Sequence, residues 1–221
     1  CEKHQEVALQ VARESMVLLK NENNILPLDK SSLDQVAAIG PNANVVRLGG
    51  YSGSPSVKIS PVEGLKKELA GEAEVKFAQG CTVTGEKEDQ GTGDQRRDES
   101  QSITEAAKLA AESDVSLLFV GTSLEVADES ADRKDLDLPG NQLELIKAVY
   151  KANPNTIVVL INGMPLAVNW TDENIPAILE AWYPGQAGGA AIADVLFGEY
   201  NPAGRLPVTF YKDTTQLPPI G

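Results

Sequence analysis

Residues 115–140 read VSLLFVGTSLEVADESADRKDLDLPG and change character at Gly121. The first part, 115–120, is an unbroken apolar run, which is typical of a strand buried on both faces of a parallel sheet. The second part, 121–140, is far longer than the roughly 2–6 residues of most strand-to-helix connections. It is also acidic, with carboxylates at Glu125, Asp128, Glu129, Asp132, Asp135 and Asp137 and cations only at Arg133 and Lys134. We expect this loop to carry part of the protein's function.

Strands and helices are predicted to alternate along the rest of the chain. Apolar or alternating runs predict further strands at residues 36–39, 74–78, 156–161 and 177–181, and a short last strand within 201–210. Helical patterns are found at residues 2–20, 61–70, 102–112, 141–151 and 190–197. The alternation indicates a single α/β domain over residues 1–221. We expect a three-layer α/β/α sandwich around a mostly parallel sheet of about six strands, in which an antiparallel edge strand is allowed.

Two of these helices carry more specific expectations. The first is predicted to continue to Lys20, with Val7, Val11, Ser15 and Leu18 on one stripe. Ser102 is expected to be the N-cap of the third, with Glu105 three residues later completing a capping box. The polar stretch before it, 82–99, is expected to be an exposed surface loop.

Four unusual loops are expected to lie at one edge of the sheet. They follow predicted strands at residues 40–60, 121–140, 162–165 and 182–189. Parallel α/β sheets bind ligands at the carboxyl ends of their strands. The sequence therefore predicts a functional site at this edge.

Composition excludes several classes of partner. The chain has 221 residues, of which 42% are hydrophobic, and a formal net charge of −13. That charge argues against nucleic acid and against an anionic membrane surface. No segment approaches the roughly 18 consecutive apolar residues of a membrane span. Because the chain begins with Cys1 rather than Met, we expect it to be a piece of a longer protein.

Metal, triad and thiol chemistry are also disfavoured. His4 is the only histidine, which excludes a multi-histidine metal centre, and we expect no Ser-His-Asp triad within the chain. Cys1 and Cys81 are too few for a disulfide framework or a metal site. We expect no metal and no cofactor.

Two chemistries remain open from the residues alone. The glycines of 185–189 could direct backbone N–H groups toward an anion, although the chain lacks both G-x-G-x-x-G after its first strand and a GK[ST] motif. A tight turn packed against the sheet explains the same glycines. Crowding of Asp128 and Glu129 could keep one carboxyl protonated for acid catalysis, but most carboxylates are simply solvated.

A family resemblance separates these alternatives. Residues 129–142, ESADRKDLDLPGNQ, resemble the E-x-x-D-R…L-P-G-x-Q stretch of glycoside hydrolase family 3, which includes β-glucosidases and β-xylosidases. Further similar stretches, in the same order, are LLKN with ILPL (18–28), IGPNA (39–43), WYPGQ (182–186) and 201–210. The similarity covers nearly the whole chain. It implies the second, α/β sandwich domain of a retaining exo-acting enzyme that hydrolyses a β-linked glucoside, xyloside or oligosaccharide.

The resemblance also implies roles for individual residues. Glu129 matches the family's general acid/base, whereas the Asp nucleophile belongs to a TIM-like barrel expected upstream. Retaining enzymes hold these two carboxyls about 5–5.5 Å apart. Tyr51 lies where some members place an aromatic wall against the leaving group. Asp132 and Arg133 are expected to form an ion pair that shapes the loop.

Several consequences of the resemblance are general. In many members a fibronectin-type domain follows, and a periplasmic or secreted location is implied. The isolated chain is expected to be inactive, because it carries one carboxyl of a catalytic pair. Ser130 and Ala131 depart from the Gly-aromatic pair of many β-glucosidases, so glucoside or xyloside specificity stays open. The alternative function is a non-catalytic carbohydrate- or nucleotide-binding module.

Overall fold

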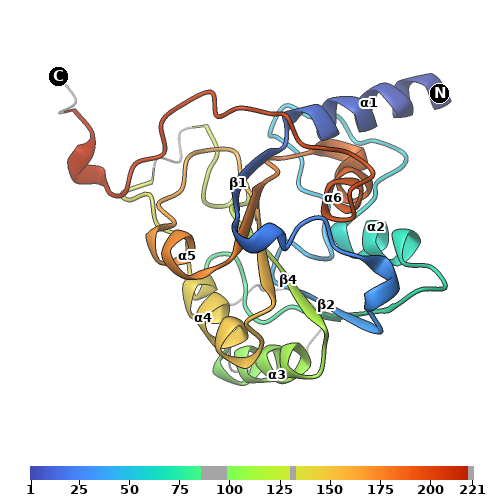
Figure 1. Cartoon of the computed structure of the whole chain (residues 1–221). Helices are drawn as coiled ribbons and strands as arrows, with labels where there is room; N and C mark the ends of the chain where they lie inside the picture. The colour runs from blue at the N-terminus through green and yellow to red at the C-terminus, as the bar shows by residue number, and fades with distance from the viewer. Residues whose placement is uncertain (86–98, 130–132, 219–221) are drawn as a thin grey trace, which may run out of the picture.

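The centre of the molecule is a six-stranded sheet with helices on both faces (Figure 1). A computed structural model describes residues 1–85, 99–129 and 133–218. The strand order is β1-β6-β5-β4-β2-β3, with β1 antiparallel to β6 and all other neighbours parallel. The strands are β1 Val17–Asn21, β2 Gln35–Ile39, β3 Glu74–Ala78, β4 Val115–Gly121, β5 Thr156–Ile161 and β6 Ala177–Glu180. The expected three-layer sandwich with a mostly parallel sheet is confirmed.

The helices form two outer layers. In Figure 1, α1, α2 and α6 cover one face of the sheet, and α3, α4 and α5 cover the other. The helices are α1 Glu2–Ser15, α2 Pro61–Glu68, α3 Glu99–Ala111, α4 Gln142–Ala152, α5 Asn169–Asn174 and α6 Gly188–Leu196. Each layer belongs to its own hydrophobic cluster, so the sheet separates two cores.

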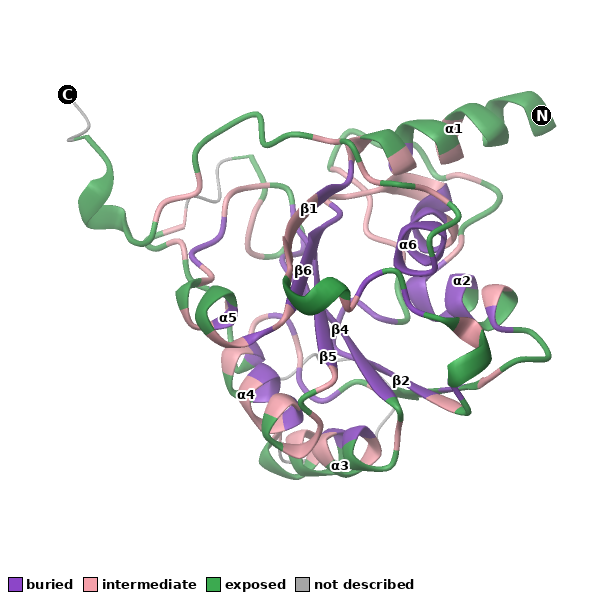
Figure 2. Ribbon diagram, in the orientation of Figure 1, coloured by how far each residue is buried: buried purple, intermediate pink, exposed green. Residues whose placement is uncertain are grey.

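The central strands explain why this fold forms. Every residue of β4 and of β5 is buried (Figure 2). Because side chains alternate along a strand, Leu117 and Phe119 enter the core beneath α2 and α6, whereas Leu118 and Val120 enter the core beneath α3 and α4. Phe119 is fully buried. Its truncation to Ala would cost about 3–5 kcal/mol of unfolding free energy.

The first predicted helix is wrong beyond Ser15. There the chain becomes extended at Met16 (φ −69°, ψ 139°), and residues Val17–Asn21 form β1, paired with β6. The apolar run Val17-Leu18-Leu19 fits a strand as well as a helix, and the free edge of β6 offers it backbone partners. Val7 and Val11, expected on the buried stripe, are 52% and 60% exposed.

The predicted last strand within 201–210 is also wrong. The described backbone there forms no strand. Pro202 and Pro207 lack the N–H that a ladder needs. Gly204 instead donates its N–H to the carbonyl of Met16 (3.1 Å). The antiparallel edge position is taken by β1 from the other end of the sequence.

Two smaller differences concern the helices. Helix α3 begins at Glu99, so Ser102 lies inside it and is not the N-cap. The short helix α5 was not predicted. The predicted surface loop at 82–99 falls largely on residues 86–98, which lie outside the described part of the chain.

Candidate active-site rim

The four loops predicted to share one edge do come together. Asn42, after β2, donates its N–H to the carbonyl of Phe119 in β4 (3.2 Å). Thr122, after β4, donates its N–H to the carbonyl of Ile161 in β5 (3.0 Å). The loop after β2 also bonds to the turn after β6, through the N–H of Ile59 and the carbonyl of Gln186 (2.9 Å). We call this edge the rim.

Two glycines allow the backbone to pass close to the neighbouring strand where β2 and β4 end. Gly40 has φ +120°, and a Cβ there would lie 2.3 Å from the carbonyl oxygen of Phe119. Gly121 has φ +140°, and a Cβ there would lie 2.1 Å from the carbonyl oxygen of Ile161. The positive φ and the lack of room for a Cβ exclude any residue other than glycine at both positions. The loop that begins at Gly121 therefore starts in contact with the next strand.

A buried glutamine joins the two ends of the Gly121–Gly140 loop. Gln142 is fully buried in the first turn of α4, and its Oε1 accepts the N–H of Gly121 (2.8 Å). Its Nε2 donates to the carbonyl oxygens of Gly121 (2.8 Å), Pro139 (3.0 Å) and Val83 (3.2 Å). The last residue of the L-P-G-x-Q motif thus fixes both ends of the loop.

At the tip of the loop, Glu129 and Tyr51 meet. Glu129 is exposed, and Tyr51, from the loop after β2, is 91% exposed. The Tyr51 hydroxyl donates a hydrogen bond to Oε2 of Glu129. This bond is the main reason why the pKa of Tyr51 lies above its ordinary value. Slight desolvation and the nearby Asp128 charge raise it further. The two predicted site residues, 78 positions apart in the chain, therefore face the same solvent-open point.

Asp128 supports this arrangement from the backbone side. Its Oδ1 accepts the N–H of Glu129 (2.8 Å). A Cβ added at Gly50, next to Tyr51, would lie 3.1 Å from the same oxygen. The two loops are thus in close contact where their functional candidates lie.

Arg133 folds back onto its own loop and onto the turn after β5. Its side chain is only 10% exposed and pairs with Asp135 (3.2 Å). It also donates to the carbonyl of Asp137, and Nη1 lies 3.9 Å from the sulfur of Met164. These contacts suit the loop-shaping role expected for Arg133. Asp132, its expected partner, lies outside the described residues.

A buried carboxyl beneath the rim was not predicted. Glu180 ends β6, is fully buried, and accepts the N–H of Trp182 (2.8 Å) and Nδ2 of Asn162 (3.3 Å). Burial raises the pKa of Glu180 to about 8, against the lowering effect of these two hydrogen bonds. A charged residue closing an otherwise apolar strand was the signal in the sequence.

Tyr183 links the turn after β6 to the base of the loop. Its hydroxyl and Oγ1 of the buried Thr122 are 2.8 Å apart. The ring packs closely on Gly163, where a Cβ would lie 2.9 Å from Cε2 of Tyr183. Burial raises the pKa of Tyr183, while the bond to Thr122 and the nearby Arg47 charge oppose that change.

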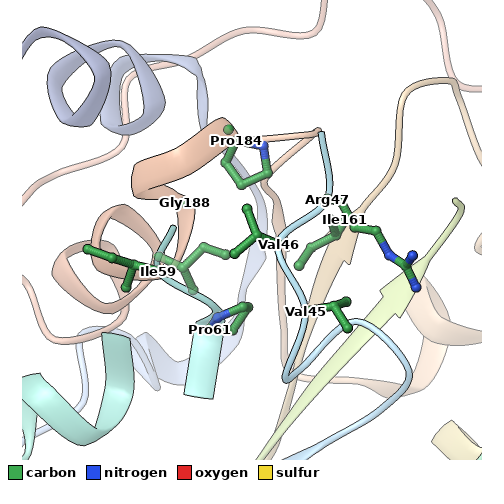
Figure 3. Close-up of a pocket in the computed structure, with 11 residues that line it drawn as sticks. Val45, Val46, Arg47, Ile59, Pro61, Ile161, Pro184 and Gly188 are labelled. Atoms are coloured by element: carbon green, nitrogen blue, oxygen red, sulfur yellow. The ribbon is translucent and has the colours of Figure 1, made fainter. Parts of the chain in front are cut away.

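The glycine-rich turn at 185–189 is packed rather than open. Gly189 donates its N–H to the carbonyl of Ile59 (2.9 Å), and a Cβ there would lie 1.9 Å from the Ser60 oxygen. The cavity between this turn and the loop after β2 has a volume of about 10 Å³ (Figure 3). That is room for about one water molecule. In Figure 3 the Arg47 side chain points away from it. The turn therefore favours packing over nucleotide binding.

Within residues 1–85, 99–129 and 133–218, no group of three or more His, Cys, Asp or Glu side chains could hold a metal ion. None of the described helices combines the length and apolar character needed to cross a membrane. The free thiol of Cys81 is buried, which raises its pKa to about 12.

The profile of one protein family matches almost the whole chain. It is described as the glycosyl hydrolase family 3 C-terminal domain, and it matches residues 16–220. The chain belongs to this family. The resemblance carried by residues 121–140, the Glu129 loop, is therefore confirmed, and the chain is a family 3 domain.

Relatives of the family 3 domain include enzymes named β-xylosidase and enzymes named β-glucosidase. It is 42% identical to a β-xylosidase of Formosa agariphila, over 98% of this chain and 30% of that protein. It is 37% identical to the periplasmic β-glucosidase of Salmonella typhimurium, over 97% of this chain and 29% of that protein. The family 3 domain thus spans about a third or less of the curated relatives it matches.

Solved structures agree with this assignment. A β-glucosidase of Erythrobacter marinus superposes with a TM-score of 0.88 at 40% identity, covering 98% of this chain and 31% of that one. A family 3 β-glucosidase of Bifidobacterium adolescentis gives 0.80 at 38% identity, covering 93% and 28%. The sandwich described above is therefore the fold of the corresponding region of these enzymes.

Proposed function

We propose that the family 3 domain is the second domain of a retaining exo-β-glycosidase and that Glu129 is its general acid/base. The observation that carries the proposal is the meeting of Glu129 and Tyr51 at an exposed point of the rim. A proton donor must reach a substrate that binds outside its own domain. The long loop, fixed at its base by Gln142, suits that requirement.

Glu129 would act in both steps of a retaining reaction. As the neutral acid it gives its proton to the glycosidic oxygen while a nucleophilic carboxylate attacks the sugar. As the carboxylate it then takes a proton from the water that hydrolyses the glycosyl-enzyme intermediate.

The nucleophile is proposed to come from outside this chain. Retaining enzymes need their two carboxyls about 5–5.5 Å apart. We propose that an aspartate on a TIM-like barrel, upstream in the same polypeptide, faces Glu129 across the rim. A downstream fibronectin-type domain is also proposed. The small share of its relatives' length that this domain covers supports such an arrangement.

Tyr51 is proposed as the aromatic wall of the leaving-group site. Its ring is free in solvent, and its hydroxyl contacts the acid that would protonate the leaving group. Sugars stack well on such rings because both present an apolar face. The substrate would be a β-linked glucoside, xyloside or oligosaccharide. Relatives named for xylosides and for glucosides leave the sugar open.

Glu129→Ala in the full-length polypeptide tests the proposal. Loss of general acid catalysis should lower kcat/KM about 10²–10⁴-fold for alkyl glycosides, which have poor leaving groups. The glycosylation step with dinitrophenyl glycosides, whose leaving group needs no proton, should change much less. The matched control is Glu125→Ala, an exposed carboxylate of the same loop, which should leave both substrates unaffected. Equal activity of wild type and Glu129→Ala on alkyl glycosides would refute the assignment.

The rival function, a non-catalytic binding module, makes the opposite prediction for the chain alone. It requires tight binding of a sugar or a nucleotide by residues 1–221, measurable by calorimetry. The split site requires that the chain alone hydrolyse no aryl glycoside. Clear turnover by it would contradict the need for a second domain.

A further inference from the structure

The buried carboxyl of Glu180 contacts both turns that hold the Glu129 loop in place. It lies at the carboxyl end of β6, and the turn after β5 runs beside it. Glu180 and Asp194 are the only buried carboxyls among the residues that the structure describes. Asp194, in α6, is paired with Arg13 (2.7 Å). None of the described Lys, Arg or His side chains forms a salt bridge with Glu180, so charge pairing does not explain why this carboxyl is buried.

One oxygen of Glu180 fixes the turn after β6. Oε1 accepts the N–H of Trp182 (2.8 Å), a residue with φ +56°. A non-glycine residue in this left-handed region is strained and must be held by its surroundings. The next residue, Tyr183, bonds through its hydroxyl to Thr122 at the start of the Glu129 loop. The position of Tyr183 therefore depends on the hydrogen bond to Glu180.

The other oxygen fixes the turn after β5. Oε2 accepts Nδ2 of Asn162 (3.3 Å), and the same Nδ2 donates to the carbonyl of Met164 (2.7 Å). The sulfur of Met164 contacts Arg133, a residue of the Glu129 loop (3.9 Å). Asn162 is fully buried, and its Oδ1 has no partner among the described groups. Its amide is thus oriented by Glu180 and Met164.

The two sets of contacts reach the Glu129 loop on both sides of the proposed acid. Thr122 lies seven residues before Glu129, and Arg133 lies four residues after it. Both are held by turns that Glu180 bonds directly, while Glu180 itself is buried beneath them. An apolar side chain could fill the same volume without the cost of burying a carboxyl. Its two acceptor oxygens are what an apolar residue lacks.

We propose that Glu180 is a positioning residue for the acid/base: through the 162–165 and 182–189 turns it sets where Glu129 is presented. This inference rests on the proposed function. Displacing a catalytic group by about 1 Å can cost up to about 100-fold in rate. A loosened turn should therefore impair proton transfer while leaving the fold and sugar binding largely intact.

The test uses the full-length polypeptide and two substrates with the same sugar, an alkyl glycoside and a dinitrophenyl glycoside. Glu180→Gln keeps the side-chain shape but replaces one oxygen, which can accept a hydrogen bond whether or not the carboxyl is protonated, by an NH2 group that cannot accept. Either the N–H of Trp182 or Nδ2 of Asn162 then loses its acceptor. We expect kcat/KM for the alkyl glycoside to fall about tenfold or more, with the glycosylation step of the dinitrophenyl glycoside within about twofold. Tyr183→Phe removes only the link to Thr122 and should show the same pattern, several-fold in size.

Asp194→Asn is the matched control. It removes the other buried carboxyl and its pairing with Arg13, so it should lower thermal stability. Any change that it causes in kcat/KM should be the same for the alkyl and the dinitrophenyl glycoside. Equal losses on both substrates for Glu180→Gln and Tyr183→Phe, as expected of a purely structural role, would overturn the inference. If Glu180→Gln does not fold, Tyr183→Phe alone decides. Glu129→Ala could lose activity mainly on the alkyl glycoside, as the proposed function requires, while Glu180→Gln and Tyr183→Phe show no such preference. That result would refute the positioning role of Glu180 and leave the proposed function standing.

Discussion

The base and the tip of the Glu129 loop differ in almost every physical respect. At the base, Gln142 is fully buried and makes four hydrogen bonds, and Glu180 is fully buried beneath the neighbouring turns. At the tip, Glu129 and Tyr51 are exposed and bonded to each other. Changes at the base should therefore lower stability, whatever they also do to the position of Glu129. Changes at the tip should alter activity and leave stability almost untouched.

Among changes within the Glu129 loop and its anchors, Gln142→Met should give the largest loss of stability. Methionine nearly matches the volume of glutamine, but it leaves the N–H of Gly121 and three carbonyl oxygens without their partner. Each buried unsatisfied group costs about 1–3 kcal/mol. With four groups left unpaired, we expect the free energy of unfolding in urea to fall by at least about 4 kcal/mol. Gln101→Met, on the exposed side of α3, should change it by less than about 0.5 kcal/mol. Equal effects of the two changes would contradict the role of Gln142.

The pH dependence of stability should reveal Glu180. Its pKa rises from an ordinary value of 4.5 to about 8 in the folded chain, because the ionised form is buried. The folded state therefore binds the proton more tightly than the unfolded state. The stabilisation from this proton is fully present below pH 4.5 and is lost as the pH rises to 8. The slope approaches about 1.4 kcal/mol per pH unit at most.

Urea unfolding of wild type and Glu180→Gln between about pH 5 and 8 measures this effect. The wild-type protein should lose stability with rising pH over this window, and the variant, which cannot ionise there, should lose less. Parallel curves for the two proteins would show that Glu180 does not titrate in the folded state as described.

Tyr51→Phe should have the smallest effect on stability. The ring is exposed and stays in place, so the free energy of unfolding should change by less than about 0.5 kcal/mol. The bond to Glu129 raises the pKa of Tyr51. Ultraviolet titration should therefore show one tyrosine whose pKa falls when Glu129 is changed to Gln. A phenol titration identical in both proteins would place the Tyr51 hydroxyl away from Glu129.

The sheet was largely predictable because its central strands are buried on both faces. The runs in β4 and β5 have no polar face to confuse with a helix, so their positions followed from the sequence. Val17-Leu18-Leu19 fits either element, and only the free edge of β6 makes it a strand. The second antiparallel candidate, 201–210, failed because its prolines cannot join a ladder.

The candidate site was predictable at its tip and hidden at its base. Glu129 was predicted from the motif at residues 129–142 and Tyr51 from its place in the loop after β2, and both predictions rest on the family resemblance. The role of Gln142 depends on Gly121, 21 residues earlier, and on Val83, 59 residues earlier. Glu180 acquires its environment only when β6 is covered on both faces. Such long-range burial has no local pattern in the sequence.

The most direct test of the central claim is the product that Glu129→Ala forms in the presence of azide. Azide is an anion that attacks the glycosyl-enzyme intermediate without needing a general base. If Glu129 is the acid/base of a retaining enzyme, the full-length variant should turn over a dinitrophenyl glycoside faster with azide. The product should be the β-glycosyl azide, identified by nuclear magnetic resonance. No acceleration, or an α-glycosyl azide, would contradict the account.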